Sequence, residues 1–222
     1  MKKIIPLLIA VLLVMGLTAC GSDKRSDTAE KSVSAEANDA KEQDENDKTS
    51  ENTTAEAETE PSHAGSDVLV IYFSATGTTR GVAEKIAAVT GADVYEIKAA
   101  QEYTADDLNY NDPESRTTLE QNDSSVRPEI GSEDISLDGY SVIYMGYPIW
   151  WGEEPRIMDT FVESHSFDGI TVIPFCTSGG SGIGRSGKNL ADNAGSGNWL
   201  DGQRFGSGAS QEEIESWING LQ

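Results

Sequence analysis

Residues 69–79 read Leu-Val-Ile-Tyr-Phe-Ser-Ala-Thr-Gly-Thr-Thr and constrain the fold more than any other stretch. The first five form an apolar run, rich in β-branched and aromatic side chains, that is typical of a buried parallel strand. Hydroxyls around Gly77 follow, and a helical pattern begins at once. A strand that enters a helix through such a turn aims unpaired backbone N–H groups and the positive end of the helix dipole at one point. The sequence therefore predicts an anion site, with phosphate as the expected ligand.

The side chains of this loop add to the anion site. Hydroxyls are offered by Ser74, Thr76, Thr78 and Thr79. The alternative is that they only cap the helix, because Ser and Thr are favoured at helix N-termini for structural reasons. Four hydroxyls beside a glycine exceed what a cap needs, so we favour phosphate binding.

The N-terminus resembles the export signal of a bacterial lipoprotein. Lys2 and Lys3 precede an apolar run over residues 4–17, which is short for a membrane span. The run ends in Leu-Thr-Ala-Cys-Gly, similar to a lipobox, which implies that residues 1–19 are a signal peptide and that Cys20 is lipidated. The alternatives are an ordinary signal peptide or an uncleaved anchor with a coincidental cysteine. We expect an extracytoplasmic protein that is lipid-anchored to the cell membrane.

Composition divides the rest of the chain. Residues 20–66 contain almost no large apolar side chain, so we expect a disordered acidic tether. Residues 67–222 are long enough for one domain. From Val68 onward nine Lys and Arg stand against 24 Asp and Glu, which argues against nucleic acid as a partner. One cysteine besides Cys20 and two histidines predict neither a disulfide nor a metal site.

Within residues 67–222 strand and helix patterns alternate, which predicts a parallel sheet covered by helices on both faces, a three-layer α/β/α fold. Residues 99–138 interrupt the alternation with a long polar stretch, with weak helical patterns near Thr104–Leu108 and after Pro113. The predicted strands are 68–73, 93–98, 140–146, 171–176 and a short one within 199–205. The predicted helices are 81–90, one starting at Pro155, one near 188–193 and one at the C-terminus.

Ligands of such sheets bind outside the carboxyl ends of the strands, and three unusual loops follow these ends. The first is the hydroxyl loop. The second, residues 146–155, places Trp150 and Trp151 in a turn, and we expect one to pack inward and the other to face the pocket. The third, residues 177–184, is nearly all Gly and Ser and can approach a flat ligand closely. Together they suit a phosphorylated planar molecule.

These loops identify the family that the chain resembles. Ser-Ala-Thr-Gly-Thr-Thr, Gly-Tyr-Pro-Ile-Trp-Trp and Thr-Ser-Gly-Gly-Ser-Gly are similar to motifs of flavodoxins, over the whole length from Val68 onward. The resemblance implies a doubly wound five-stranded parallel sheet of order 2-1-3-4-5 that binds FMN. The implied phosphate residues are Ser74, Ala75, Thr76, Gly77, Thr78 and Thr79. Those implied near the flavin ring are Pro148, Ile149, Trp150, Trp151, Gly152, Glu153, Thr177, Ser178, Gly179, Gly180, Ser181 and Gly182.

The resemblance implies a function in electron transfer, with a redox protein or a membrane electron donor as partner. Acidic surroundings disfavour the extra negative charge of a reduced flavin, so we expect a low reduction potential. Two alternatives stay open: an FMN-dependent NAD(P)H or quinone oxidoreductase, and a cofactor-free binding module. The long 99–138 segment departs from a short flavodoxin and is a candidate cover for the pocket; Tyr103, Tyr110 and Arg116 within it have no assigned role.

Overall fold

The computed structural model describes residues 65–221. The predicted signal peptide, the predicted lipidation site Cys20 and the predicted tether up to residue 64 lie outside the described residues. In the part that the structure describes, no helix has the length and apolar character needed to cross a membrane.

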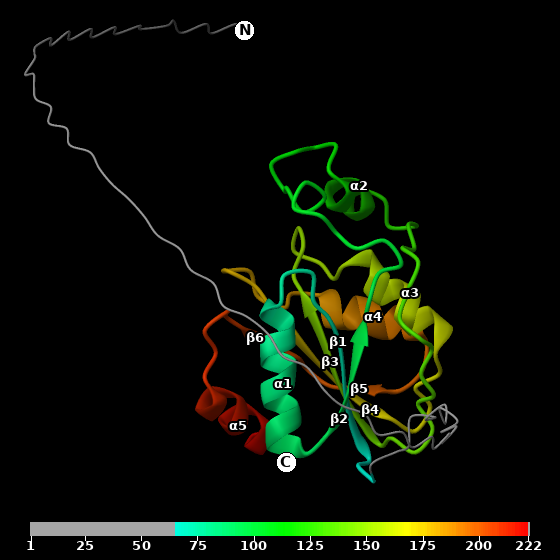
Figure 1. Cartoon of the computed structure of the whole chain (residues 1–222). Helices are drawn as coiled ribbons and strands as arrows, with labels where there is room; N and C mark the ends of the chain where they lie inside the picture. Colours follow the sequence, from blue (N-terminus) through cyan, green and yellow to red (C-terminus); the bar gives the residue numbers. More distant parts are fainter. Residues whose placement is uncertain (1–64, 222) are drawn as a thin grey trace, which may run out of the picture. The chain divides into compact units, whose positions relative to one another are not determined.

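A parallel sheet lies at the centre of the described part (Figure 1). Its strands follow the order β2-β1-β3-β4-β5, and each neighbouring pair is parallel. The main strands are β1 (Val68–Phe73), β2 (Asp93–Ile97), β3 (Val142–Pro148) and β4 (Thr171–Thr177). The predicted doubly wound sheet of order 2-1-3-4-5 is confirmed.

Two short strands share the fifth position of the sheet. Both β5 (Asn198–Trp199) and β6 (Gln203–Phe205) pair with β4. Leu200 N donates to the Val172 carbonyl at 2.9 Å, so the backbone groups of Val172 face the edge of β4 that pairs with β5 and β6. Pro174, two residues further along β4, faces the same edge. Pro174 has no N–H to donate, and the ladder breaks opposite it.

Helices cover both faces of the sheet (Figure 1). Alternate side chains of β1 divide between two cores, because neighbouring residues of a strand point to opposite faces. Val70 and Tyr72 join one core with side chains of α1 and α5, whereas Ile71 and Phe73 join the other with side chains of α3 and α4. The helices are α1 (Thr78–Thr90), α3 (Arg156–Ser164), α4 (Ser186–Ala194) and α5 (Gln211–Asn219).

The 99–138 segment lies above the carboxyl ends of the strands (Figure 1). It contains α2 (Arg116–Asn122), which confirms a helix after Pro113. The helix predicted near Thr104–Leu108 is wrong, since these residues form turns. Thr104 N donates to the Asp107 carboxylate at 2.9 Å and Asp107 N donates back to Thr104 Oγ1 at 3.2 Å, which is the reciprocal pair of a helix start. Leu108 N donates to the Thr104 carbonyl at 3.2 Å, but the next amide, Asn109 N, donates to Asp106, so the chain closes a single turn and does not continue as a helix.

Candidate functional site

The hydroxyl loop joins β1 to α1 and leaves the start of that helix open. Gly77 is the N-cap residue, at φ +84°, and α1 has no side-chain cap. Gly81 N donates to the Gly77 carbonyl at 3.0 Å, so the amides before Gly81 have no partner within the helix. The alternative that the loop hydroxyls serve as caps therefore has no support in the structure, and the free N–H groups suit an anion.

Two hydroxyls of this loop are buried. Thr79 Oγ1 lies 2.8 Å from Thr177 Oγ1, which joins the first loop to the end of β4. Ser74 Oγ is buried and has no hydrogen-bond partner among the described residues. An unpaired buried hydroxyl is unfavourable, so a ligand oxygen at this point would supply what Ser74 lacks. Thr76 and Gly77 are exposed.

The second loop is a tight turn that carries both tryptophans. Trp150 and Glu153 exchange two backbone hydrogen bonds of 3.0 Å, with Trp151 at φ +50° and Gly152 at φ +87° between them. Positive φ at both central residues is typical of a type I′ turn. Trp150 packs edge-on against the Phe73 ring at 5.6 Å, whereas 45% of Trp151 is exposed.

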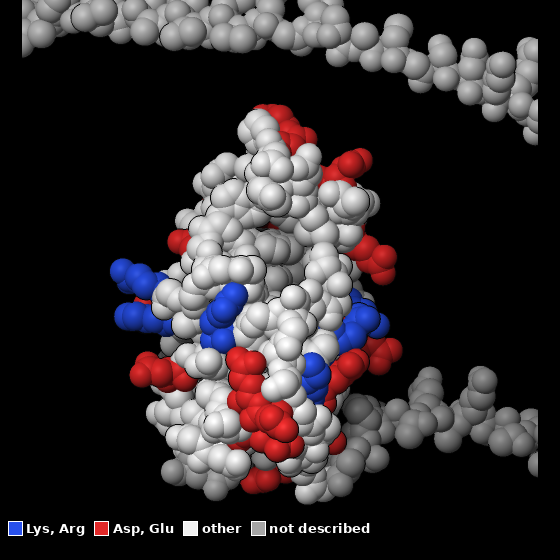
Figure 2. Space-filling view, turned by 90° about the vertical axis from the view of Figure 1, so that its left-hand side faces the viewer, with Lys and Arg blue, Asp and Glu red and all other residues white. Residues whose placement is uncertain are grey.

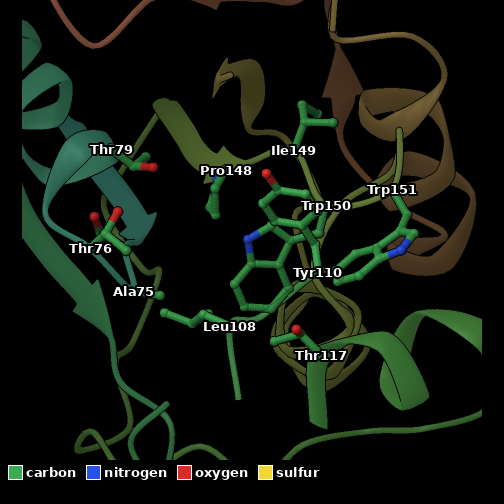
Figure 3. Close-up of a pocket in the computed structure, with 11 residues that line it drawn as sticks. Ala75, Thr76, Thr79, Leu108, Tyr110, Thr117, Pro148, Ile149, Trp150 and Trp151 are labelled. Atoms are coloured by element: carbon green, nitrogen blue, oxygen red, sulfur yellow. The ribbon is translucent and has the colours of Figure 1, made fainter. Parts of the chain in front are cut away.

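The first two loops enclose a cavity of about 370 Å³ (Figure 3). Both tryptophans line it. Trp150 packs inward against Phe73 and Tyr103, as expected for one of the pair, but it faces the cavity together with Trp151. No lining residue is charged, and Figure 2 shows a hollowed face bordered mostly by uncharged side chains. The residues that line the cavity are Ser74, Ala75, Thr76, Thr79, Leu108, Tyr110, Thr117, Pro148, Ile149, Trp150 and Trp151.

The third loop lies beside this cavity without lining it. Thr177 reaches the site through its bond to Thr79, and its carbonyl accepts from Ile149 N at 2.9 Å. The residues after it, 178–182, are half-buried or exposed. The Arg204 guanidinium donates to the Ser178 carbonyl at 2.7 Å and holds the start of the loop. Gly152 and Glu153 also lie outside the cavity lining. The contact of these residues with a flavin stays a prediction.

Comparisons with known proteins identify the family. The family model described as Flavodoxin matches residues 67–221. The chain belongs to the flavodoxin family. Two solved structures classed as flavoproteins are similar to it. One, from Bacteroides uniformis, is 47% identical with a TM-score of 0.66, over 68% of this chain and 97% of that one. The other, from Bacteroides eggerthii, is 45% identical with a TM-score of 0.65, over 69% and 96%.

A third structure is that of a flavoprotein from Lactobacillus acidophilus in complex with FMN. It is 22% identical with a TM-score of 0.49, over 68% of this chain and 97% of that one, a likeness that carries no argument here. No curated protein matches the chain. Membership of the flavodoxin family supports FMN as the cofactor.

The 99–138 segment of this flavodoxin domain supplies a wall of the cavity. Leu108, Tyr110 and Thr117 all line it. The sequence marked the segment as a candidate cover and noted Tyr110, but it did not single out Leu108 or Thr117. Leu108 and Tyr110 are large side chains in an otherwise polar stretch, and that contrast was the available signal. Tyr103 lies behind the wall, with its ring 5.3 Å from that of Trp150.

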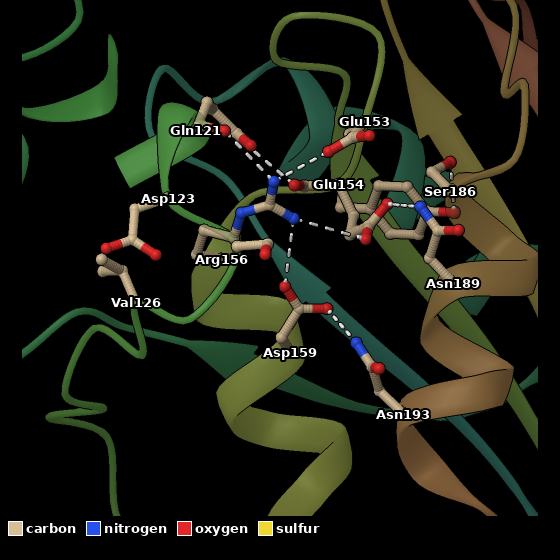
Figure 4. A network of polar contacts seen from close by, with 12 residues as sticks. Gln121, Asp123, Val126, Glu153, Glu154, Arg156, Asp159, Ser186, Asn189 and Asn193 are labelled. Atoms are coloured by element: carbon tan, nitrogen blue, oxygen red, sulfur yellow. Dashed lines mark hydrogen bonds and ion pairs between the residues drawn. The ribbon is translucent and has the colours of Figure 1, made fainter. Parts of the chain in front are cut away.

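Buried charges lie next to the tryptophan turn (Figure 4). The side chains of Glu154 and Asp159 are 1% exposed, and the Arg156 side chain between them is 7% exposed. Burial raises the pKa of Glu154 to about 7 and also raises the pKa of Asp159. Cys176 is buried in β4, where burial raises the pKa of its thiol to about 12, so it is unreactive.

Proposed function

We propose that this flavodoxin domain binds FMN in the cavity and carries electrons while a lipid on Cys20 tethers it to the outer face of the cell membrane. One observation carries the proposal: the open start of α1 and the unpaired Ser74 hydroxyl adjoin an uncharged cavity walled by two tryptophans. When bound, FMN supplies the redox chemistry.

The chain's own residues would bind and orient this cofactor. The hydroxyls of Ser74, Thr76 and Thr79 and the first amides of α1 would hold the phosphate. The apolar walls, with Trp150 and Trp151, would exclude water from the ring and orient it. Because the domain is strongly acidic, we expect it to hold the reduced flavin at low potential and to favour a redox partner with a basic surface.

The visible absorption spectrum of the purified protein tests this proposal, followed by a reductive titration. Flavin bands that bleach in two separable one-electron steps are the expected result for an electron carrier. A protein that stays colourless after FMN is added would contradict the proposal and favour the cofactor-free binding module.

A second candidate function is an FMN-dependent oxidoreductase. The observation in its favour is that Leu108, Tyr110 and Thr117 line the cavity, so the 99–138 segment could shape a site for a small substrate beside the flavin. Turnover of NADH with a quinone by the purified protein would support the enzyme. The carrier predicts negligible turnover of that pair and rapid oxidation by a redox protein.

A further inference from the structure

Arg156 is a buried cation that contacts several segments at once (Figure 4). One guanidinium nitrogen donates to Glu153 Oε2 at 2.8 Å and to the Gln121 carbonyl at 3.3 Å. The other lies 3.5 Å from Asp159 Oδ2 and 3.8 Å from Glu154 Oε1. Glu153 and the Gln121 carbonyl therefore accept hydrogen bonds from Arg156, whereas Asp159 and Glu154 surround it as ion-pair partners.

Two of these partners, Gln121 and Glu153, belong to the segments that form the two walls of the cavity. Gln121 lies at the end of α2, the helix whose Thr117 lines one wall. Glu153 closes the turn that begins at Trp150, in the other wall. Gln121 Nε2 also donates to the Glu154 carbonyl at 3.0 Å, so the two walls are joined twice at this point.

Stability alone gives a poor account of this arrangement. Burying a guanidinium and two carboxylates carries a large desolvation penalty, and apolar residues of similar volume often replace such groups without loss. The hydrogen bonding around Arg156 is also incomplete, because Arg156 Nε and Gln121 Oε1 are buried without a partner among the described residues. Positional specificity is the better explanation of a buried charge in such a place.

Helix α4 holds the carboxylates in place from the other side. Asn189 Nδ2 donates to Glu154 Oε2 at 3.2 Å, and Asn193 Nδ2 donates to Asp159 Oδ1 at 2.9 Å. The carboxylates are therefore fixed to the sheet domain, and Arg156 transmits that position to Gln121 in the 99–138 segment.

We propose that Arg156 is a positioning residue that locks the end of α2 to the Trp150–Glu153 turn and thereby slows the release of FMN from the cavity. The inference rests on the proposed binding of FMN. It assigns to the 99–138 segment the role of a wall whose opening limits flavin exchange, and to Arg156 the role of holding that wall closed.

A second arginine offers a matched control. Arg127 also joins the 99–138 segment to α3, through Glu163 near the end of that helix, at 2.6 Å. The two side chains of this pair are 30% and 39% exposed. The hydrogen bonds of Arg127 go to Glu163, Ser124 and Val126, so they do not reach α2 or the Trp150–Glu153 turn. Neither residue lines the cavity. If any weakening of the contact between the 99–138 segment and α3 speeds FMN release, variants of both arginines should show it. The proposed lock predicts faster release only in the Arg156 variant.

The test compares Arg156→Lys with Arg127→Lys in the full chain. Lysine keeps the charge that the buried carboxylates need and loses the planar fork that also reaches Gln121. We expect Arg156→Lys to release FMN about tenfold faster, in line with the loss of one charge-assisted hydrogen bond. We expect Arg127→Lys to stay within about twofold of the wild type. Flavin fluorescence after dilution measures the release rate.

Hydrogen exchange of the α2 amides in the FMN-free protein is the second readout. Faster exchange at α2 in Arg156→Lys, with unchanged exchange in β1 and β3, is expected if Arg156 locks this helix. A folded Arg156→Lys protein with wild-type FMN release and wild-type exchange at α2 would overturn the inference. Wild-type protein that takes up no FMN would instead refute the proposed function, and exchange at α2 would still report on the lock.

Gln121→Ala keeps the experiment decisive if Arg156→Lys does not fold. It removes only the side-chain bond to the Glu154 carbonyl and leaves every charge in place. We expect faster FMN release and faster α2 exchange, by a smaller factor than in Arg156→Lys. Unchanged values of both in this variant would overturn the inference.

Discussion

Replacing Glu154 by Gln should remove a pH dependence of stability that the wild-type protein carries through this buried carboxyl. Burial raises its pKa from the ordinary value of 4.5 to about 7. Between these values the native state holds a proton that the unfolded chain has lost. The native state therefore binds more protons, and the free energy of unfolding falls as pH rises through this window. Each unit of pKa difference between the two states is worth about 1.4 kcal/mol. The rise from 4.5 to about 7 therefore lowers the free energy of unfolding by about 3 kcal/mol once the pH is above both values.

Glutamine is close in shape to the protonated acid and can still accept from Asn189. The variant should match the wild type near pH 4.5 and should exceed its stability by about 3 kcal/mol near pH 8. Urea unfolding of the FMN-free protein at several pH values measures this difference. Asp159 is unchanged in both proteins, and its negative charge adds to burial in raising the pKa of Glu154.

Glu163→Gln is the matched control, since Arg127 lowers the pKa of Glu163 through a hydrogen bond. Its ionised form stabilises the fold, so this variant should be the less stable one at neutral pH, with a difference that shrinks in acid. A difference between Glu154→Gln and wild type that stays constant with pH would refute the reasoning about burial.

Three further predictions concern the site, the sheet and the anchor. Ser74→Ala should weaken FMN binding about tenfold. The stability of the FMN-free protein should stay unchanged or rise slightly, because the Ser74 hydroxyl has no hydrogen-bond partner among the described residues. Equal FMN affinity of the two proteins in a fluorescence titration would contradict the phosphate role. Gly146→Ala should lower the free energy of unfolding by about 3 kcal/mol, because its Cβ would lie 2.1 Å from the Phe175 ring, whereas Gly152→Ala, with open space but φ +87°, should lose only about 1 kcal/mol. Cys20→Ser should move the protein from the membrane to the soluble fraction of cells, and a variant that remains in the membrane would exclude lipidation as the anchor.

The sheet could be predicted because its strands are defined by local patterns. The apolar run at Val68–Phe73 was predicted with the bounds that β1 has in the structure. The sequence of residues 198–205 does not predict that two short strands, β5 and β6, share the fifth position. The interruption between them arises because Pro174 of β4 faces this edge, and that orientation follows only from the register between the strands.

Some parts of the candidate site could likewise be predicted from local sequence, and others could not. The hydroxyl loop and the tryptophan turn are continuous in sequence, so their chemistry was visible as motifs. Whether both tryptophans line the cavity depends on the positive φ of Trp151, which is uncommon for so bulky a residue and is not encoded by any local signal. The wall formed by Leu108 and Tyr110 depends on how a long polar segment folds back over the sheet.

The burial of the charged residues next to the tryptophan turn could not be predicted from the local sequence, because it depends on residues far away in the chain. In sequence, Glu-Glu-Pro-Arg at residues 153–156 has the composition of an exposed helix start, where charged side chains are normally solvated. In the structure Gln121 approaches from 35 residues away and Asn189 from 35 residues on the other side, and together they bury Glu154 and Arg156. The burial that raises the pKa of Glu154 and the contact that ties α2 to the turn are therefore one long-range packing event. For that reason the pH dependence of stability and the rate of FMN release should respond to the same few residues.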